Sequence, residues 1–421
     1  MDTAKLNEYA DLLVRIGLNV QEGQSVNIFA PVDCAVLARA CAQCCYDAGA
    51  REVTVMWNDD QISRMKYLHA DDSVFDEMPH WLKSFYDSAL EKKCPHLAIV
   101  GDDPESLKGV DPTRIQRWRQ VTGKSIEGYY KAQTNNEFQW LVAACPTEPW
   151  ANMVFPACED AMEKLWEAIF AAVRVTGDGK AVERWAEHTK EQKKIVEKLN
   201  NYAFTTLHYS NSLGTDLTVG MPENHFWSGA SESAGTGVEF IANLPTEEIF
   251  SLPHRDKVNG KVYASKPLSL NGNLIDGFWM ELKDGKIVDL HADVGEEYLR
   301  KSVTLDEGSS YFGEVALVPY DSPISNTGLL FYETLFDENA ACHFAFGEAY
   351  PCIYGADKLS SEEQAALGIN QSINHVDFMV GTSDLKIVGP RILHRVGAYI
   401  HSLGLRLRER ELPRHQYSVP V

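Results

Sequence analysis

The sequence predicts an α/β protein in which an N-terminal α/β domain with a mostly parallel sheet precedes a β-rich C-terminal α+β domain. Short apolar segments alternate with helical patterns through the first half of the chain, which is typical of a parallel sheet wrapped by helices. From about residue 207 the pattern changes to short strands separated by hairpin turns. The length of 421 residues leaves room for two or three domains.

The first half is expected to contain four strands, at residues 25–30, 52–57, 96–101 and 139–144. Helices are expected over residues 6–16, 34–48, 81–90, 161–175 and 180–202. A further helix is expected to start at Asp111-Pro112-Thr113, because proline is favoured in the first turn of a helix. Cys41 and Cys44 have CxxC spacing, but no second pair completes a zinc site and both lie inside a helical pattern. We therefore interpret them as packing residues.

The second half is expected to form β-hairpins. Turn signals occur at residues 213–216, at Asn271-Gly272 and at Asp284-Gly285. The change of pattern places a domain boundary near residue 200, which gives domains 1–200 and 201–421. The tail from Glu409 onwards contains two prolines and is expected to be an extended arm.

The charge balance limits the partners of the protein. Lys and Arg number 39 and Asp and Glu number 60, so the formal net charge is −21. Binding to nucleic acid draws on Lys and Arg to replace counterions at phosphates, so this composition argues against a nucleic-acid partner. An acidic protein instead concentrates cations, and carboxylates are good ligands for hard metals.

No segment predicts membrane association. The N-terminus lacks a basic segment that leads into an apolar run, which argues against a secretory signal. The most apolar stretch, residues 165–175, is too short to span a bilayer and contains Glu167 and Arg174. We therefore expect a cytoplasmic protein.

The turns of the N-terminal domain do not resemble phosphate-binding loops. The turn after the first expected strand, residues 31–34, has no glycine, and the turn after the third, residues 101–104, is acidic. Neither matches the spacing of a nucleotide-binding loop, and a negative turn at a helix N-terminus would repel phosphate. The N-terminal domain is therefore expected to be a scaffold.

Histidine and acidic residues recur in four apolar segments of the second half. His375 and Asp377 are two residues apart, so on a strand their side chains project to the same side. Residues 244–250, 311–318 and 337–350 also carry acids or histidine, and none of the four segments contains Lys or Arg. Acids in apolar surroundings need a partner. The four segments together predict an anionic cluster that a cation would stabilise.

The segments NLPTEEIF, GEVALV, FDENAACHFAFGEAY and HVDFMVG resemble the signature blocks of the thermophilic-type metalloaminopeptidases. This is the family of aminopeptidase T, aminopeptidase S and PepS. The order and spacing of the blocks match over the C-terminal half, and the α/β pattern extends the resemblance to nearly the whole chain. The resemblance implies that domain 201–421 is catalytic and binds two metal ions. The implied ligands are Glu248, Glu314, Glu338, His343, His375 and Asp377, with Tyr350 as the catalytic tyrosine.

The implied site agrees with elementary chemistry. Four carboxylates offset the charge of two divalent ions, and carboxylates with imidazoles suit zinc first, then cobalt or manganese, with magnesium possible in addition. Two such ions can share a water and polarise a scissile carbonyl. Tyr350 is placed to stabilise an oxyanion, and Glu314 is the first candidate for the proton acceptor, with Glu248 as the alternative. The resemblance further implies short peptide substrates and a homodimer whose active sites face an internal cavity.

Two other functions remain open at this point. A mononuclear non-haem iron ring-cleavage dioxygenase would need only His343, His375 and Asp377, which form a 2-His-1-carboxylate triad. One iron would leave the three glutamates without a role, which argues against this alternative. A non-enzymatic binding protein is the third reading, and the complete set of ligands argues against it.

Overall fold

The computed structural model describes residues 2–270, 273–390, 396–401 and 406–411. The chain forms two compact units. Unit 1 comprises Met1–Thr189 and Ser231–Thr246, and unit 2 comprises Lys190–Ala230 and Glu247–Val421. The proposed domains 1–200 and 201–421 stay a prediction. The expected turn at Asn271-Gly272 and the expected arm beyond residue 411 lie outside the described residues.

Unit 1 is built on a parallel sheet with the strand order β10-β4-β3-β1-β2. Its strands are β1 (Ser25–Pro31), β2 (Glu52–Asn58), β3 (His96–Val100), β4 (Trp140–Ala144) and β10 (Asn243–Leu244). The four strands expected in this region are confirmed. The fifth, β10, has only two residues and was not expected. It pairs with β4 across about a hundred residues of sequence, so no local pattern reveals it.

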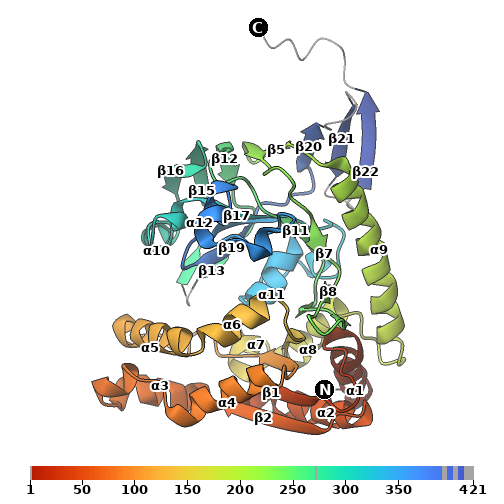
Figure 1. Cartoon of the computed structure of the whole chain (residues 1–421), viewed down its shortest axis with the longest axis vertical. Helices are drawn as coiled ribbons and strands as arrows, with labels where there is room; N and C mark the ends of the chain where they lie inside the picture. Colours follow the sequence, from red (N-terminus) through yellow and green to blue (C-terminus); the bar gives the residue numbers. More distant parts are fainter. Residues whose placement is uncertain (1, 271–272, 391–395, 402–405, 412–421) are drawn as a thin grey trace. The chain divides into compact units, whose positions relative to one another are not determined.

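The helices expected in this region are present, and two further helices, over residues 127–134 and 148–154, were not expected (Figure 1). The helices of unit 1 are α1 (Thr3–Leu12), α2 (Ala35–Asp47), α3 (Asp60–His69), α4 (His80–Glu91), α5 (Pro112–Ser125), α6 (Glu127–Thr134), α7 (Glu148–Val154) and α8 (Ala161–Ala172). The Asp111 side chain accepts a hydrogen bond from the N–H of Thr113, and Pro112 opens α5, as predicted. Cys41 is buried in α2, which agrees with the packing role expected for it, whereas Cys44 is only partly buried. Helix α9 (Ala181–Tyr202) leads into unit 2.

Unit 2 contains two larger antiparallel sheets. One has the order β19-β18-β17-β11-β7 and the other the order β16-β15-β12-β6-β5-β20-β21-β22. A hydrophobic core contains residues of both, among them Phe312, Phe344 and Phe378 of the first sheet and Leu207 and Val262 of the second. The parallel sheet of unit 1 and these antiparallel sheets confirm the predicted fold class.

The strands of the first sheet are β7 (Ser228–Gly229), β11 (Ile249–Ser251), β17 (Phe312–Leu317), β18 (His343–Gly347) and β19 (His375–Met379). The second sheet contains β5 (Thr206–Ser210), β6 (Asp216–Gly220), β12 (Val258–Tyr263), β15 (Trp279–Lys283), β16 (Lys286–His291), β20 (Lys386–Pro390), β21 (Val396–His401) and β22 (Arg406–Glu411). Two small ladders join β13 (Leu268–Leu270) with β14 (Asn273–Ile275) and, in unit 1, β8 (Glu232–Ser233) with β9 (Glu239–Phe240). The remaining helices are α10 (Glu296–Ser302), α11 (Thr334–Asp337) and α12 (Ser361–Ala366).

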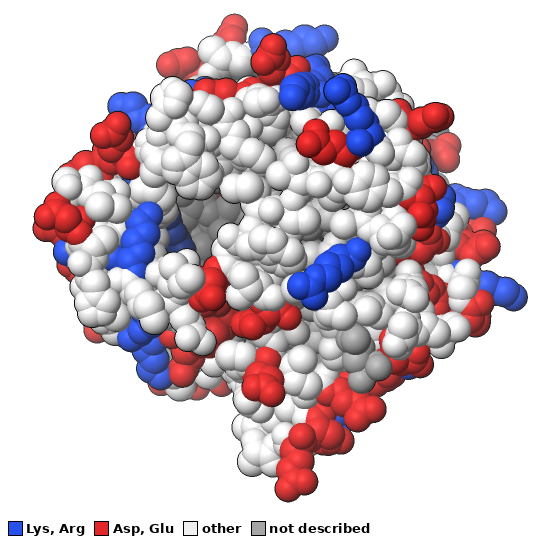
Figure 2. All heavy atoms as spheres, turned by 90° about the horizontal axis from the view of Figure 1, so that it is seen from below, with Lys and Arg blue, Asp and Glu red and all other residues white. Residues whose placement is uncertain are grey.

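Acidic side chains are spread over the face of the molecule drawn in Figure 2, with Lys and Arg scattered among them. This distribution agrees with the net charge of −21. None of the described helices combines the length and the apolar character that a membrane span requires.

We expect one buried histidine of unit 1 to make stability depend on pH. The ring of His96 on β3 is buried, its Nδ1 lies 3.0 Å from the hydroxyl of Tyr129, and desolvation lowers its pKa to about 4. The unfolded chain takes up this proton near pH 6.5. The neutral form therefore contributes stability that is present above pH 6.5 and is lost as the pH falls towards 4, by about 3 kcal/mol in all.

The measurement is urea unfolding between pH 7 and pH 4.5. The matched variant is His96→Asn, whose amide keeps a polar partner for Tyr129 but does not titrate. The difference in unfolding free energy between wild type and variant is expected to shrink as the pH falls. A difference that is independent of pH would contradict the assignment.

Candidate metal centre

Three neighbouring strands, and the residue that precedes a fourth, place acids and histidines on one face of the first sheet of unit 2. On β18, Phe344 and Phe346 belong to the hydrophobic core, so His343 points to the opposite face. On β19, Val376 and Phe378 face the core, so His375 and Asp377 share the opposite face. This outcome confirms the prediction that His375 and Asp377 lie on a strand and project to the same side.

A β-bulge brings Glu314 onto the same face. The pairing of β17 with β18 shifts between Phe312 and Glu314, which inserts Gly313 as an extra residue. Without the bulge Glu314 would share a face with Phe312, which packs in the core. A Cβ atom at position 313 would lie only 2.2 Å from the carbonyl oxygen of Glu348, so the bulge requires glycine here.

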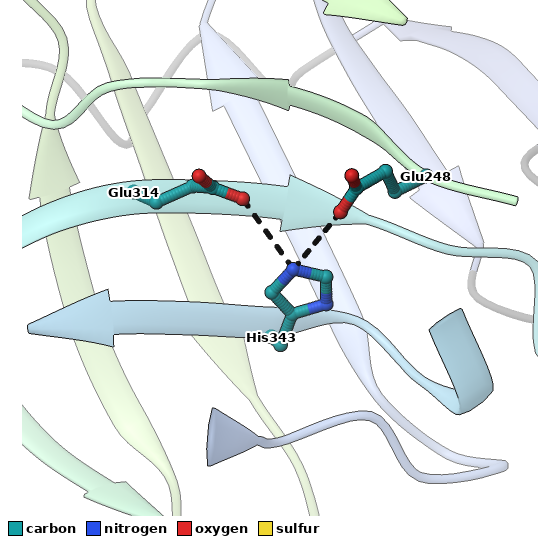
Figure 3. A group of neighbouring side chains, drawn as sticks. All are labelled: Glu248, Glu314 and His343. Atoms are coloured by element: carbon teal, nitrogen blue, oxygen red, sulfur yellow. Dashed lines mark ion pairs between the residues drawn. The ribbon is translucent and has the colours of Figure 1, made fainter. Parts of the chain in front are cut away.

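The first group of side chains comprises Glu248, Glu314 and His343 (Figure 3). The Nε2 atom of His343 lies 3.1 Å from Oε2 of Glu248 and 3.4 Å from Oε1 of Glu314. All three residues are more than nine-tenths buried. Glu248 immediately precedes β11, and its neighbour Glu247 is engaged elsewhere through its backbone, since its N–H donates to Oδ1 of Asn339. The structure thus places Glu248, rather than Glu247, against His343.

The second group comprises Glu314, His375 and Asp377. The Nε2 atom of His375 lies 3.5 Å from Oε2 of Glu314 and 3.3 Å from Oδ1 of Asp377. Glu314 therefore belongs to both groups and turns one carboxylate oxygen towards each histidine.

Backbone carbonyls orient both imidazole rings. Nδ1 of His343 lies 3.1 Å from the carbonyl oxygen of Ala341, and Nδ1 of His375 lies 2.7 Å from that of Glu348. A carbonyl only accepts, so in each neutral ring Nδ1 carries the hydrogen and Nε2 presents a lone pair. In the neutral rings that a metal ion would require, both lone pairs face carboxylate oxygens. Acceptors that face one another in a buried place call for a cation between them.

Two buried polar atoms of the face lack a hydrogen bond. Nε2 of His343 and Oδ1 of Asp377 are both buried and make no hydrogen bond of suitable geometry. Buried polar atoms in native proteins nearly always have partners, so such atoms need an explanation. Carboxylate oxygens and imidazole nitrogens are the donor set that divalent zinc, cobalt and manganese prefer. The residues therefore fit a divalent metal.

The directions of the pKa shifts in the site are those expected where a positive charge is missing. Burial raises the pKa of Glu314 and raises that of Glu338 still further, where the carboxylates of Glu248 and Asp377 add to the effect. Burial opposes protonation of His375, but Asp377 and Glu314 outweigh it and raise its pKa to about 10. The face thus holds more negative charge than its histidines balance, and a cation would offset that excess.

Two predicted residues lie beside these groups. Glu338 follows α11, and burial together with the charges of Glu248 and Asp377 raises its pKa, but it belongs to neither group of ligand atoms. Tyr350 follows β18, and its ring centre lies 5.5 Å from that of His375. Burial and the carboxylates of Glu314 and Asp377 raise the pKa of Tyr350, so its hydroxyl keeps its proton. The side chain nonetheless remains 45 % exposed, which leaves it accessible to a substrate.

Sequence reasoning missed the residues that hold the ligands in place. Asn339 is fully buried, and its side chain bridges the carbonyl of Leu335 and the N–H of Glu247. The carbonyls of Ala341 and Glu348, which set the imidazole tautomers, belong to the backbone and carry no sequence signal. Asn339 lies next to Glu338 in the block FDENAACHF, and this neighbourhood is the one sequence feature that could have indicated its role.

A buried centre of carboxylates and imidazoles on a β-sheet is typical of metal-dependent hydrolases. Residues 2–393 match the family model described as "Thermophilic metalloprotease (M29)", and the chain belongs to this family. The resemblance found in the sequence is therefore confirmed.

Relatives match over most of their length. Aminopeptidase AmpS from Bacillus subtilis is 42 % identical over 388 residues, which cover 91 % of this chain and 94 % of the relative. Aminopeptidase T from Thermus aquaticus is 39 % identical and covers 92 % of this chain and 95 % of its own. Among solved structures, wild-type AmpT from Thermus thermophilus superposes with a TM-score of 0.85 at 37 % identity, covering 91 % of this chain and 94 % of that chain. A 2,5-dihydroxypyridine dioxygenase from Pseudomonas putida reaches a TM-score of only 0.49 at 10 % identity.

Proposed function

We propose that this metalloprotease is an aminopeptidase that uses two divalent metal ions to remove N-terminal residues from short peptides. The observation that carries the proposal is the carboxylate of Glu314, which turns one oxygen towards each of two histidines whose lone pairs face acids. The names of the relatives, which are aminopeptidases, support the activity.

The two groups that share Glu314 would hold one ion each. Glu248 and His343 would complete the first site, and His375 and Asp377 the second, with Glu338 as a further ligand at the same face. The donor set favours zinc first, and cobalt, manganese or magnesium are alternatives for the test.

Different residues of the site are assigned different steps of peptide hydrolysis. When bound, divalent ions polarise the scissile carbonyl and lower the pKa of water. We assign to Glu314 the uptake of the proton of the attacking water and its delivery to the leaving amine, with Glu248 as the alternative acceptor. The hydroxyl of Tyr350, which keeps its proton, is assigned to donate a hydrogen bond to the oxyanion of the tetrahedral intermediate.

The dioxygenase alternative is less well supported. A single iron on His343, His375 and Asp377 would leave Glu248, which lies 3.1 Å from His343, as a buried acid without a counter-ion. Two metal ions would give each of the predicted carboxylate ligands a counter-ion.

Homodimerisation and a cytoplasmic location are part of the proposal. Ile62, Met65 and Leu68 lie three residues apart on α3 and are all exposed, which is typical of an interaction surface. All nine cysteines are free, as expected in a reducing compartment. Analytical ultracentrifugation of the whole protein tests the dimer, and a monomer at micromolar concentration would contradict it.

The proposed activity predicts metal-dependent release of N-terminal residues. The experiment uses chelator-stripped protein with zinc, cobalt, manganese or magnesium restored, a panel of aminoacyl-p-nitroanilides and short peptides, and the variant Tyr350→Phe. We expect metal to restore hydrolysis and Tyr350→Phe to lower kcat about a hundredfold. N-terminally acetylated peptides are the control and should not be cleaved. A folded, metal-loaded protein that releases no residue would refute the proposal and direct attention to oxygen uptake with iron.

A further inference from the structure

Phe250 on β11 is an aromatic residue on the face of the first sheet of unit 2 that carries the metal ligands. The strands pair Phe250 with Ala316 of β17, and Ala316 with His343 of β18. Residues that lie opposite one another on neighbouring strands project to the same face of a sheet. Ile249, the preceding residue, points the other way and belongs to the hydrophobic core. Phe250 therefore shares its face with His343 and not with the core.

A small hydrophobic cluster fixes the place of Phe250. Phe250 is partly buried and packs against this cluster, so one part of its ring is held while another part stays outside the cluster. The buried members of the cluster are Leu252, Ala349, Cys352, Ile353, Ala356 and Ile369. The cluster thus includes Ala349, the residue that directly precedes Tyr350.

Two rings neighbour the ring of Tyr350. Its centre lies 5.8 Å from that of Phe250, with the ring planes at 56°, and 5.5 Å from that of His375, with the planes at 64°. Aromatic rings attract one another at these distances when their planes are inclined. Phe250 and one of the predicted metal ligands are therefore the two aromatic contacts that direct the ring of Tyr350.

The hydroxyl of Tyr350 is not tied down by a hydrogen bond. Among the residues that the structure describes, none makes a hydrogen bond with this hydroxyl. The backbone before Tyr350 is fixed, since the N–H of Glu348 donates to the carbonyl of Asn374 at 2.7 Å and the N–H of Ala349 donates to that of Asn370 at 3.1 Å. The side chain can still rotate about its own bonds, so the packing of the ring decides where the hydroxyl points.

Building on the proposed aminopeptidase function, we propose that Phe250 is a positioning residue that holds the ring of Tyr350 so that its hydroxyl reaches the oxyanion of the tetrahedral intermediate. The ring of Phe250 carries no hydrogen-bonding group, so it acts through Tyr350. A misplacement of about 1 Å at a reacting centre can lower the rate about a hundredfold. Because the hydrogen bond to the oxyanion forms only as the reaction proceeds, the contact supports kcat rather than substrate binding.

The test is a double-mutant cycle on the metal-loaded protein with leucyl-p-nitroanilide as substrate. We measure kcat and KM for wild type, Phe250→Ala, Tyr350→Phe and the double variant. Phe250→Ala is expected to lower kcat about thirtyfold when the Tyr350 hydroxyl is present. In the Tyr350→Phe protein the same change is expected to lower kcat less than about threefold, because the group that Phe250 positions is then absent. KM is expected to change less than about threefold in each variant.

Three further variants separate positioning from general packing. Phe250→Tyr keeps the ring and should retain at least about a third of the wild-type kcat. Phe250→Leu keeps an apolar side chain on the cluster without the ring, and it should lower kcat about tenfold even if Phe250→Ala does not fold. Phe226→Ala is the matched control, because Phe226 packs against the same cluster while its ring neighbours Tyr354 at 5.0 Å. It should keep the kcat of wild type.

The outcomes distinguish the inference from the function on which it rests. An equal loss of kcat with and without the Tyr350 hydroxyl, or a raised KM with unchanged kcat, would overturn the positioning role and leave the aminopeptidase function standing. Unchanged kcat in both Phe250→Ala and Phe250→Leu would do the same. Wild-type kcat in Tyr350→Phe would overturn the role assigned to Tyr350 and the inference together. No hydrolysis by wild type would overturn the aminopeptidase function itself.

Discussion

Replacing Glu314 by glutamine is expected to lower kcat for leucyl-p-nitroanilide about a thousandfold. The amide has nearly the same shape, but it cannot accept a proton, and it turns an N–H₂ group towards one of the two histidines that the carboxylate faces at 3.4 and 3.5 Å. Loss of a general base alone typically costs a factor of 10² to 10⁴. The measurement is steady-state hydrolysis at saturating substrate with metal in excess.

Two further variants make this result specific. Glu281→Gln changes an exposed glutamate of β15 in the same unit and should retain wild-type activity. Glu248→Gln separates the two candidates for the proton acceptor, because it removes a carboxylate that faces only one histidine. Activity of Glu314→Gln within tenfold of wild type, at equal metal content, would show that Glu314 is not the base.

Divalent metal is expected to raise the melting temperature of the protein by about 5–10 °C. The carboxylates of Glu248, Glu314 and Asp377 crowd two histidines on one buried face, so a cation that binds only the folded chain is strongly favoured there. A ligand at a hundred times its dissociation constant stabilises the folded state by about 2.7 kcal/mol. For a unit of this size, each kcal/mol raises the melting temperature by about 2–4 °C.

Differential scanning calorimetry with and without chelator measures this metal-dependent increase in melting temperature. His343→Ala removes a completely buried ligand of the first group and should reduce the metal-dependent increment. His208→Ala is the matched control, because His208 pairs with Asp216 at an exposed site of β5 away from both groups. Equal increments in wild type and His343→Ala would contradict the assigned ligands.

Much of the fold follows from local pattern. Strands β1 to β4 and the helices between them, with the exception of α6, are apparent because each is bounded by its own turn residues and carries its own periodicity, as at Asp111-Pro112. Strand β10 is not apparent, because two residues carry no periodicity and their place is decided by pairing with Val142 and Ala143. Pairing between distant segments is a property of the packed chain and leaves no mark in a short window of sequence.

The candidate site, like the fold, could be predicted only in part from local sequence pattern. The shared direction of His375 and Asp377 follows from the two-residue repeat of a strand. That Glu314 joins them does not follow from this repeat, because the bulge at Gly313 shifts the pairing with β18. The assignment of Glu338 and Tyr350 came from the family resemblance, and the structure places both beside the two groups of ligands rather than within them.

The two-faced strands β17, β18 and β19 make this part of the chain intolerant of insertions and deletions. Each strand alternates between residues that fill the core, such as Phe344 and Phe378, and residues that face the metal centre, such as His343 and Asp377. Losing one residue within β18 would carry His343 into the apolar interior and Phe344 out among the acids. Insertions and deletions among family members should therefore occur mainly in the loops between these strands. In a library of single-codon deletions, active variants with a deletion inside any of the three strands should be rare.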